Sequence, residues 1–294
     1  TNLYLDHKTT GKIVSDNRIN SVSFTGSVNG GCTISNQAND YNRFGINKQK
    51  SIGFKTTTLE LGGKDPAYVR SDADLEFAAN EISSGTFFNS GQCCCAVERV
   101  YVHHSVYHQF LDLLKKKAEQ TILGNPLDSN TTMGPMAKKG SADHIRTKIQ
   151  QAIKDGAQQI VNQELFPLSK HGSNYLSPHI LINVNHDMDI MKEETFGPVM
   201  PVMSVNSDEE AIQLMNDSKY GLTASIWTTN TLEANDIAQH INTGTVFTNK
   251  CDYLDPSLPW SGVKETGIGC SLSYLGFHQV TRPKSYYTQK SPTN

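Results

Sequence analysis

The sequence predicts an α/β protein built on largely parallel sheets. Two observations along the 294 residues support this prediction. Short segments rich in β-branched residues alternate with segments whose apolar residues have helical spacing, and glycines follow several segments of each kind. Strands that alternate with helices of this length are typical of βαβ units. The composition, 37% hydrophobic and 19% charged, is compatible with a packed core.

Strands are predicted where β-branched and aromatic residues cluster between turn residues. In chain order these segments are Ser21–Phe24, Thr56–Leu61, Asp65–Val69, Arg99–His103, a strand beginning at Ile160, His179–Ile182, Val202–Val205, Ala224–Trp227 and Thr245–Phe247. Residues 32–50 are rich in Asn, Gln and Lys and are predicted to form a solvated loop, and so is Glu193–Pro198.

Helices are predicted where apolar residues recur at three- and four-residue intervals. The segments that show this spacing are Leu75–Ile82, capped by Ser71 or Asp72; Tyr107–Ala118; Ile145–Ile153, closed by Gly156; Ala211–Met215, preceded by the capping box Ser207–Glu210; and Leu232–Ile241, before Gly244.

Charge and hydropathy exclude several classes of function. The net charge of −3 gives no electrostatic basis for binding nucleic acid or an anionic membrane. No run of eighteen apolar residues exists to span a bilayer, and the first residues do not resemble a signal peptide. The cysteines form no CxxC pairs, which indicates free thiols in a reducing, cytoplasmic compartment.

A cysteine run and an upstream carboxylate are the candidates for chemistry. Cys93, Cys94 and Cys95 follow Gly91-Gln92 after a predicted helix, and Glu60 ends a predicted strand before Gly62-Gly63. A thiolate can attack an electrophilic carbon, and a carboxylate can activate water for a second step. Each feature alone also has a structural interpretation, buried packing for the cysteines and a strand-end acid for Glu60.

Two further patterns are weaker. Gly26, Ser27 and Gly31 follow a predicted strand, where backbone N–H groups can approach a phosphate, but the spacing is not G-x-G-x-x-G and an ordinary tight turn fits as well. His104 and His108 are four residues apart, yet no carboxylate-rich motif accompanies them, so no metal site is predicted.

Several motifs together resemble the aldehyde dehydrogenase family. They occur in the order and with the spacing of that family, over nearly the whole chain: Phe24-Thr25-Gly26-Ser27, Leu59-Glu60-Leu61-Gly62-Gly63-Lys64, Phe88-Asn89-Ser90-Gly91-Gln92-Cys93-Cys94-Cys95, Glu194-Thr195-Phe196-Gly197-Pro198-Val199 and Pro259-Trp260-Ser261-Gly262-Val263-Lys264-Glu265-Thr266-Gly267. The resemblance implies Rossmann-like parallel sheets and oxidation of an aldehyde to a carboxylate with NAD or NADP.

The resemblance also implies roles for individual residues. Cys94 matches the nucleophile, which forms a thiohemiacetal and then a thioester, and Glu60 matches the base that activates the hydrolytic water. Gly26, Ser27 and Gly31 fall near the pyrophosphate of the cofactor, Glu194 on its nicotinamide ribose and Phe196 beside the nicotinamide ring. Leu61 is a further cofactor-binding position. Lys64 is assigned no catalytic role, and the departures from the family at Ile268 and Cys270-Ser271 are expected to leave the chemistry untouched.

Compared with this family, the chain is expected to lack the first half of the nucleotide-binding domain. Residues 1–62 would form the remaining part of that domain, 63–265 the catalytic domain, and 266–294 a tail whose Tyr286–Thr288 returns to the nucleotide side or supplies an intersubunit strand. The expected partners are a small-molecule aldehyde and a homo-oligomer or partner chain. A silent subunit and a thiol esterase are the alternative functions; a CoA-acylating enzyme is disfavoured, because those relatives generally lack a base at the position of Glu60.

Overall fold

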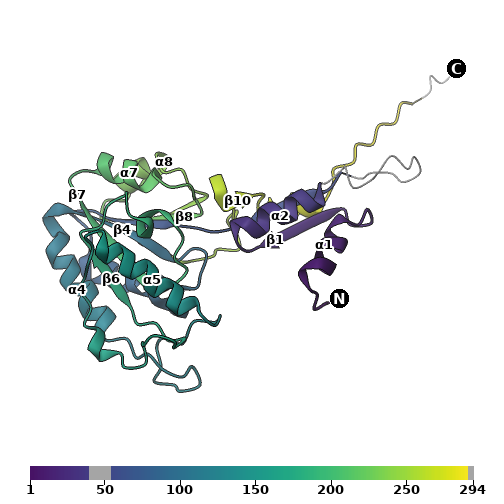
Figure 1. Ribbon diagram of the computed structural model, residues 1–294. Helices are drawn as coiled ribbons and strands as arrows, with labels where there is room; N and C mark the ends of the chain where they lie inside the picture. Colours follow the sequence, from purple (N-terminus) through teal and green to yellow (C-terminus); the bar gives the residue numbers. More distant parts are fainter. Residues whose placement is uncertain (40–53, 291–294) are drawn as a thin grey trace.

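The computed structural model describes residues 1–39 and 54–290. Helices and strands alternate along these residues and form two sheets. Figure 1 shows a larger body around one sheet, and a smaller sheet beside it with α1 and α2 next to its strands. The predicted α/β class is therefore confirmed.

The larger sheet has seven strands in the order β5-β6-β7-β4-β3-β8-β9. In chain order they are β3 (Asp65–Val69), β4 (Val97–His103), β5 (Gln158–Gln159), β6 (His179–Ile182), β7 (Val199–Val205), β8 (Thr223–Trp227) and β9 (Thr245–Thr248). All neighbouring pairs are parallel except β5 with β6. Parallel strands need long crossovers, which the intervening helices supply.

Helices cover both faces of this sheet. The helices of this part of the chain are α3 (Leu75–Phe87), α4 (Tyr107–Glu119), α5 (Ser141–Lys154), α6 (Asp189–Lys192), α7 (Asp208–Asn216) and α8 (Thr231–Gln239), with short 3₁₀ turns η2 (Phe88–Gly91), η3 (His104–Val106), η4 (Gln163–Leu165) and η5 (Lys264–Thr266). One core joins α3 and α4 to the sheet, and a second core joins α5, α7 and α8 to it.

The two cores follow from the two-residue period of a strand. Ala67 and Val69 of β3 face the α3–α4 core, while Tyr68 between them faces the α5–α7–α8 core. Since both faces are covered, β3 and β8 are buried at every position.

The smaller sheet has the order β1-β2-β10, with β1 (Ser21–Thr25) parallel to β2 (Thr56–Glu60) and β10 (Gly267–Ile268) antiparallel to β2. Helices α1 (His7–Ser15) and α2 (Val28–Ala38) accompany it, and α9 (Gly276–Val280) follows β10. The tail therefore returns to the sheet formed by the first part of the chain.

The structure corrects two predictions near the amino terminus. Residues 32–38, predicted as loop, belong to α2 because Ser27 caps that helix with its side chain; positions 40–50 of the predicted loop lie outside the described residues. Asp74, and not Ser71 or Asp72, caps α3 by accepting a hydrogen bond from the Phe77 backbone N–H at 3.1 Å.

One strand prediction is also wrong, and another stays untested. The strand expected at Ile160 is the short β5 just before it, and the Ile160 N–H donates instead to the Ile180 carbonyl. Residues 281–290 form no strand in the structure, so an intersubunit strand at Tyr286–Thr288 stays a prediction. No helix within the described ranges is long and apolar enough to span a membrane.

His179, a buried residue on β6, is expected to make the stability of the fold sensitive to acid. One ring nitrogen, Nδ1, lies 2.7 Å from the Ser177 carbonyl oxygen, and burial lowers the pKa of His179 to about 4. An unfolded histidine takes up a proton near pH 6.5, so below this pH the unfolded state binds more protons than the folded state. We expect stability to fall by about 3 kcal/mol as the pH drops from 6.5 to 4.

Denaturant titrations at a series of pH values measure this effect. His179→Gln keeps an N–H donor without titrating, so its stability should fall less over the same range. His278→Gln, at an exposed position, is the control for removing a histidine. Equal pH dependence in the native protein and His179→Gln would contradict the assignment.

Candidate active site

The three consecutive cysteines lie on a sharp turn between α3 and β4. Asn89, Ser90 and Gly91 have positive φ values of 49°, 58° and 69°, so the backbone reverses within η2. A Cβ on Gly91 would lie 2.3 Å from the Gly197 carbonyl oxygen. Only glycine fits this close approach, which holds the cysteine turn (residues 92–96) against the loop that carries Glu194 and Phe196.

Two of the three thiols of the cysteine turn contact one carboxylate. Cys93 and Cys95 donate to Oδ1 of Asp252 at 3.0 and 3.1 Å, and their sulfur atoms are 3.5 Å apart. The Sγ atom of Cys94 completes a group in which all three sulfurs lie within 4.8 Å of one another. Asp252 comes from the segment after β9, so this arrangement is a long-range contact.

The pKa values of Cys94 and Cys95 are shifted in opposite directions by their surroundings. The adjacent Cys93 and Cys95 thiols lower the pKa of Cys94, while burial and the charges of Asp65 and Glu60 oppose that shift. The same contacts raise the pKa of Cys95, which is buried. A thiolate is the reactive form of cysteine, so Cys94 is the candidate nucleophile among the three.

Glu60 stands at the end of β2, and its carboxylate accepts a hydrogen bond from the Ser271 hydroxyl. Ser271 forms an antiparallel β-bridge with Trp260. Trp260 belongs to a small core with Cys95 and Leu222, against which Cys93, Cys94 and Leu272 pack. Ser271, one of the departures expected to leave the chemistry untouched, therefore contacts the candidate base directly.

The glycine pair after Glu60 joins the strand to both other parts of the site. A Cβ on Gly63 would lie 2.4 Å from the Cys94 carbonyl oxygen, so the two backbones are in contact. The Gly63 N–H also donates to Oε1 of Glu194 at 3.1 Å. Burial and the charge of Glu98 raise the pKa of Glu194, an effect that the Gly63 hydrogen bond opposes.

Phe196 projects from a strained backbone. Its φ is 51°, uncommon for a bulky residue, and 43% of it is exposed. Glu98 on β4 holds this loop by accepting from the Thr195 and Phe196 N–H groups, each at 2.8 Å. Lys64, fully buried, pairs with Glu98 at 2.7 Å, so its role is to position the loop.

Sequence reasoning missed Glu98, Asp252 and Lys148, which donates to the Glu194 carbonyl oxygen at 2.6 Å. Glu98 had a recognisable signal, because it is an acid within the apolar strand that also holds Val97 and Val100. Asp252 and Lys148 stand in segments of ordinary polarity and offered none.

The residues expected on the nucleotide side meet at the carboxyl ends of β1 and β2. Ser27 caps α2 and accepts from the Gly30 N–H at 3.2 Å, and the Gly26 N–H donates to the Glu60 carbonyl oxygen at 3.0 Å. A Cβ on Gly31 would lie 2.5 Å from the Leu61 side chain. Gly26, Ser27, Gly31 and Leu61 are thus brought together beside Glu60.

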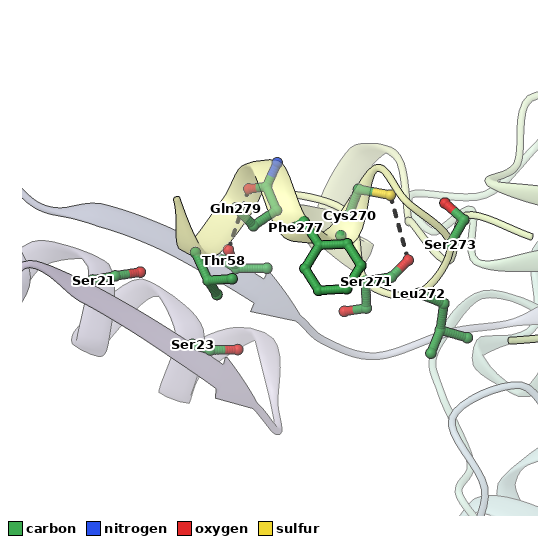
Figure 2. A pocket seen from close by; sticks show the side chains of 11 residues that line it. Ser21, Ser23, Thr58, Cys270, Ser271, Leu272, Ser273, Phe277 and Gln279 are labelled. Carbon is green, nitrogen blue, oxygen red and sulfur yellow. Dashed lines mark hydrogen bonds between the residues drawn. The ribbon is translucent and has the colours of Figure 1, made fainter. Parts of the chain in front are cut away.

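A hollow of about 350 Å³ lies on the smaller sheet but contains none of the predicted site residues. Figure 2 shows Ser21, Ser23 and Thr58 of the strands opposite Phe277 and Gln279 of α9. Ser271 lines this hollow and donates to Glu60, which is its connection to the candidate active site.

Comparison with known proteins decides the family. A model of the aldehyde dehydrogenase family matches residues 4–286. The chain belongs to the aldehyde dehydrogenase family. An aldehyde dehydrogenase of Davidiella tassiana is 37% identical to it over 268 residues, which are 91% of this chain and 51% of that protein.

Solved structures of aldehyde dehydrogenases share the fold. An NADP-dependent glyceraldehyde-3-phosphate dehydrogenase from Bacillus halodurans, complexed with NADP, superimposes with a TM-score of 0.82 at 36% identity, covering 93% of this chain and 53% of that one. A betaine aldehyde dehydrogenase from Staphylococcus aureus, in complex with NAD⁺, gives 0.82 at 29% identity, covering 92% and 51%. The chain thus spans about half the length of the aldehyde dehydrogenases that it matches.

Proposed function

We propose that this chain oxidises an aldehyde to a carboxylate with NAD⁺ or NADP⁺, through a covalent intermediate on Cys94. The aldehyde, the oxidised cofactor and water give the carboxylic acid, the reduced cofactor and a proton. The observation that carries the proposal is the activated Cys94 thiol in backbone contact with the glycine turn that follows Glu60.

In the first step the Cys94 thiolate adds to the aldehyde carbon. The carbonyl π electrons move to oxygen and form a thiohemiacetal oxyanion, which backbone N–H groups of the cysteine turn would stabilise. The lowered pKa of Cys94 keeps the thiolate available near neutral pH, where a free thiol with a pKa of about 8.5 is mostly protonated.

The residues present fit a dinucleotide cofactor. The capped start of α2 directs backbone N–H groups outward, as anion sites at helix N-termini do, and the missing side chain of Gly31 lets α2 pack closely on Leu61. The Glu194 carboxylate would accept from a ribose hydroxyl, and the exposed ring of Phe196 would pack beside the nicotinamide. A bound nicotinamide would supply the acceptor for the hydride that leaves the carbon attached to Cys94.

In the last step Glu60 removes a proton from water, which attacks the thioester carbon. The C–S bond breaks, the carboxylate leaves and Cys94 recovers its electron pair. Ser271 would orient the Glu60 carboxylate for this step.

The division into domains belongs to the same proposal. The chain passes from the smaller to the larger sheet between β2 and β3, which supports the predicted boundary near residue 62. Residues 63–265 would be the catalytic domain, and the tail from 266 rejoins the nucleotide side through β10. In the described sheet β1 is an edge strand, which would suit a homo-oligomer or partner chain.

A thiol esterase is the second candidate. The groups that lower the pKa of Cys94 are its own neighbours Cys93 and Cys95, so acylation by an activated ester requires no cofactor. Ester cleavage without NAD(P)⁺, lost in Cys94→Ala, would support this activity.

Glu60→Gln tests the proposed oxidation. The amide cannot take a proton from water, so the thioester should form and persist while steady-state turnover falls by about 10²–10⁴. Intact mass spectrometry after mixing the intact protein with aldehyde and NAD(P)⁺ should find one acyl group on Cys94.

Ser271→Ala is the matched variant, because it keeps the carboxylate and removes only the hydroxyl that Glu60 accepts from. It should lose less turnover than Glu60→Gln. Unchanged turnover in Glu60→Gln, or no aldehyde-dependent NAD(P)H formation by the native protein across a panel of aldehydes, would refute the proposal.

A further inference from the structure

Three cysteine sulfurs lie within 4.8 Å of one another, and the Asp252 carboxylate contacts two of them. We propose that Cys93, Cys94, Cys95 and Asp252 form a binding site for a thiophilic divalent cation, Zn²⁺, and that the bound ion blocks Cys94. Metal binding follows from the ligand geometry alone, whereas the blocked activity rests on the proposed function.

The distances suit a four-coordinate ion. A tetrahedral zinc with Zn–S bonds of about 2.3 Å separates its sulfur ligands by about 3.8 Å. Cys93 and Cys95 are 3.5 Å apart at sulfur, and no pair of the three exceeds 4.8 Å, so closure requires movements of about 1 Å. Oδ1 of Asp252 lies 3.0 and 3.1 Å from the Cys93 and Cys95 sulfurs. Its carboxylate is not among the ligand atoms that lie within 4.8 Å of one another, so it must move toward Cys94 to complete the site.

The donor set selects the class of ion. Thiolates favour Zn²⁺ over Mg²⁺ and Ca²⁺, which prefer oxygen ligands throughout. On binding, the thiol protons are released to solvent and each sulfur lone pair forms a bond to the metal, so affinity should rise with pH. Three thiolates and one carboxylate carry the same total charge as the Cys₄ set of structural zinc sites.

The surroundings provide both support and access. Cys95 packs in a small core with Trp260 and Leu222, which limits the freedom of the cysteine turn. Asp252 also lines a surface hollow of about 240 Å³ between α3 and the segment after β9, so this ligand borders space at the surface.

Occupation of this site would regulate the thiol chemically. A Cys94 sulfur bonded to zinc has no free lone pair directed at an aldehyde, so Zn²⁺ should inhibit reversibly and a chelator should restore activity. Zinc should also protect Cys93, Cys94 and Cys95 from alkylation, while the exposed Cys32 continues to react.

Titration of the intact, reduced protein with Cd²⁺ tests the site, because cadmium thiolates absorb in the ultraviolet. We expect one Cd²⁺ per chain with the absorption of three thiolates, displaced by Zn²⁺. Cys93→Ser and Cys95→Ser should each remove one third of the absorption and weaken binding at least about tenfold, and Asp252→Asn should weaken binding with the absorption kept. Cys32→Ser is the matched control and should change neither.

Absorption of a single thiolate, or a titration that Cys93→Ser leaves unchanged, would overturn the site. Zinc protection of all three cysteines, mapped by alkylation of the native protein, supports it without any variant that must fold. A protein that binds Cd²⁺ as expected but oxidises no aldehyde refutes the proposed function and keeps the site; an active protein that binds none refutes only the site.

Discussion

Replacing Cys94 by alanine is expected to lower aldehyde-dependent NAD(P)H formation by about 10⁴-fold or more, as removal of a covalent nucleophile does in other enzymes. No other group in the described site combines a lowered thiol pKa with backbone contact to the turn after Glu60. Cys94→Ser should be nearly as inactive, because a hydroxyl does not ionise in the range where this thiol does.

Two measurements separate a chemical effect from a structural one. Substoichiometric iodoacetamide at neutral pH should label Cys94 ahead of the other cysteines in the native protein. Cys32→Ala, at an exposed position on α2, should keep both activity and stability. Activity retained in Cys94→Ala, or equal labelling of all the cysteines, would assign the chemistry elsewhere.

Replacing Glu98 by glutamine is expected to cost about 3–5 kcal/mol of stability, the range typical of breaking a buried ion pair. The change leaves the Lys64 ammonium buried without its counter-charge; burial already lowers the pKa of Lys64, and Glu98 opposes that shift. It also weakens the acceptor for the Thr195 and Phe196 N–H groups, so the strained loop beside the proposed cofactor site should loosen.

Denaturant unfolding measures the stability, and the KM for NAD(P)⁺ reports the loop. Lys219→Met is the matched control, because it breaks an exposed pair with Glu193 and should cost less than about 1 kcal/mol. The double variant Lys64→Met/Glu98→Gln should cost less than the sum of its single changes. If Glu98→Gln lowers the free energy of unfolding no more than Lys219→Met does, the buried pair does not hold the loop.

The sequence predicted the architecture well where the spacing of the apolar residues and the capping residues indicate the same element. Segments such as Ala224–Trp227 and Tyr107–Ala118 are found close to their predicted places, because a strand buried on both faces and an amphipathic helix have distinct patterns. The predictions failed where the local pattern was ambiguous. Asp72 resembles a helix cap, yet its carboxylate accepts from Thr228 and Thr229, more than 150 residues later.

The sequence by itself determined the α/β class, the family and the candidates Cys94 and Glu60, since these depend on patterns within short stretches. Only the tertiary structure decided their surroundings: Asp252 at the thiols, Ser271 at Glu60, and the Lys64–Glu98 pair beneath Phe196. Each of these contacts joins segments distant in the chain, and the polar residues involved have no period that marks their partners. Which of these residues pair depends on which loops the two sheets bring together at one edge. The order of residues along the chain does not specify that arrangement.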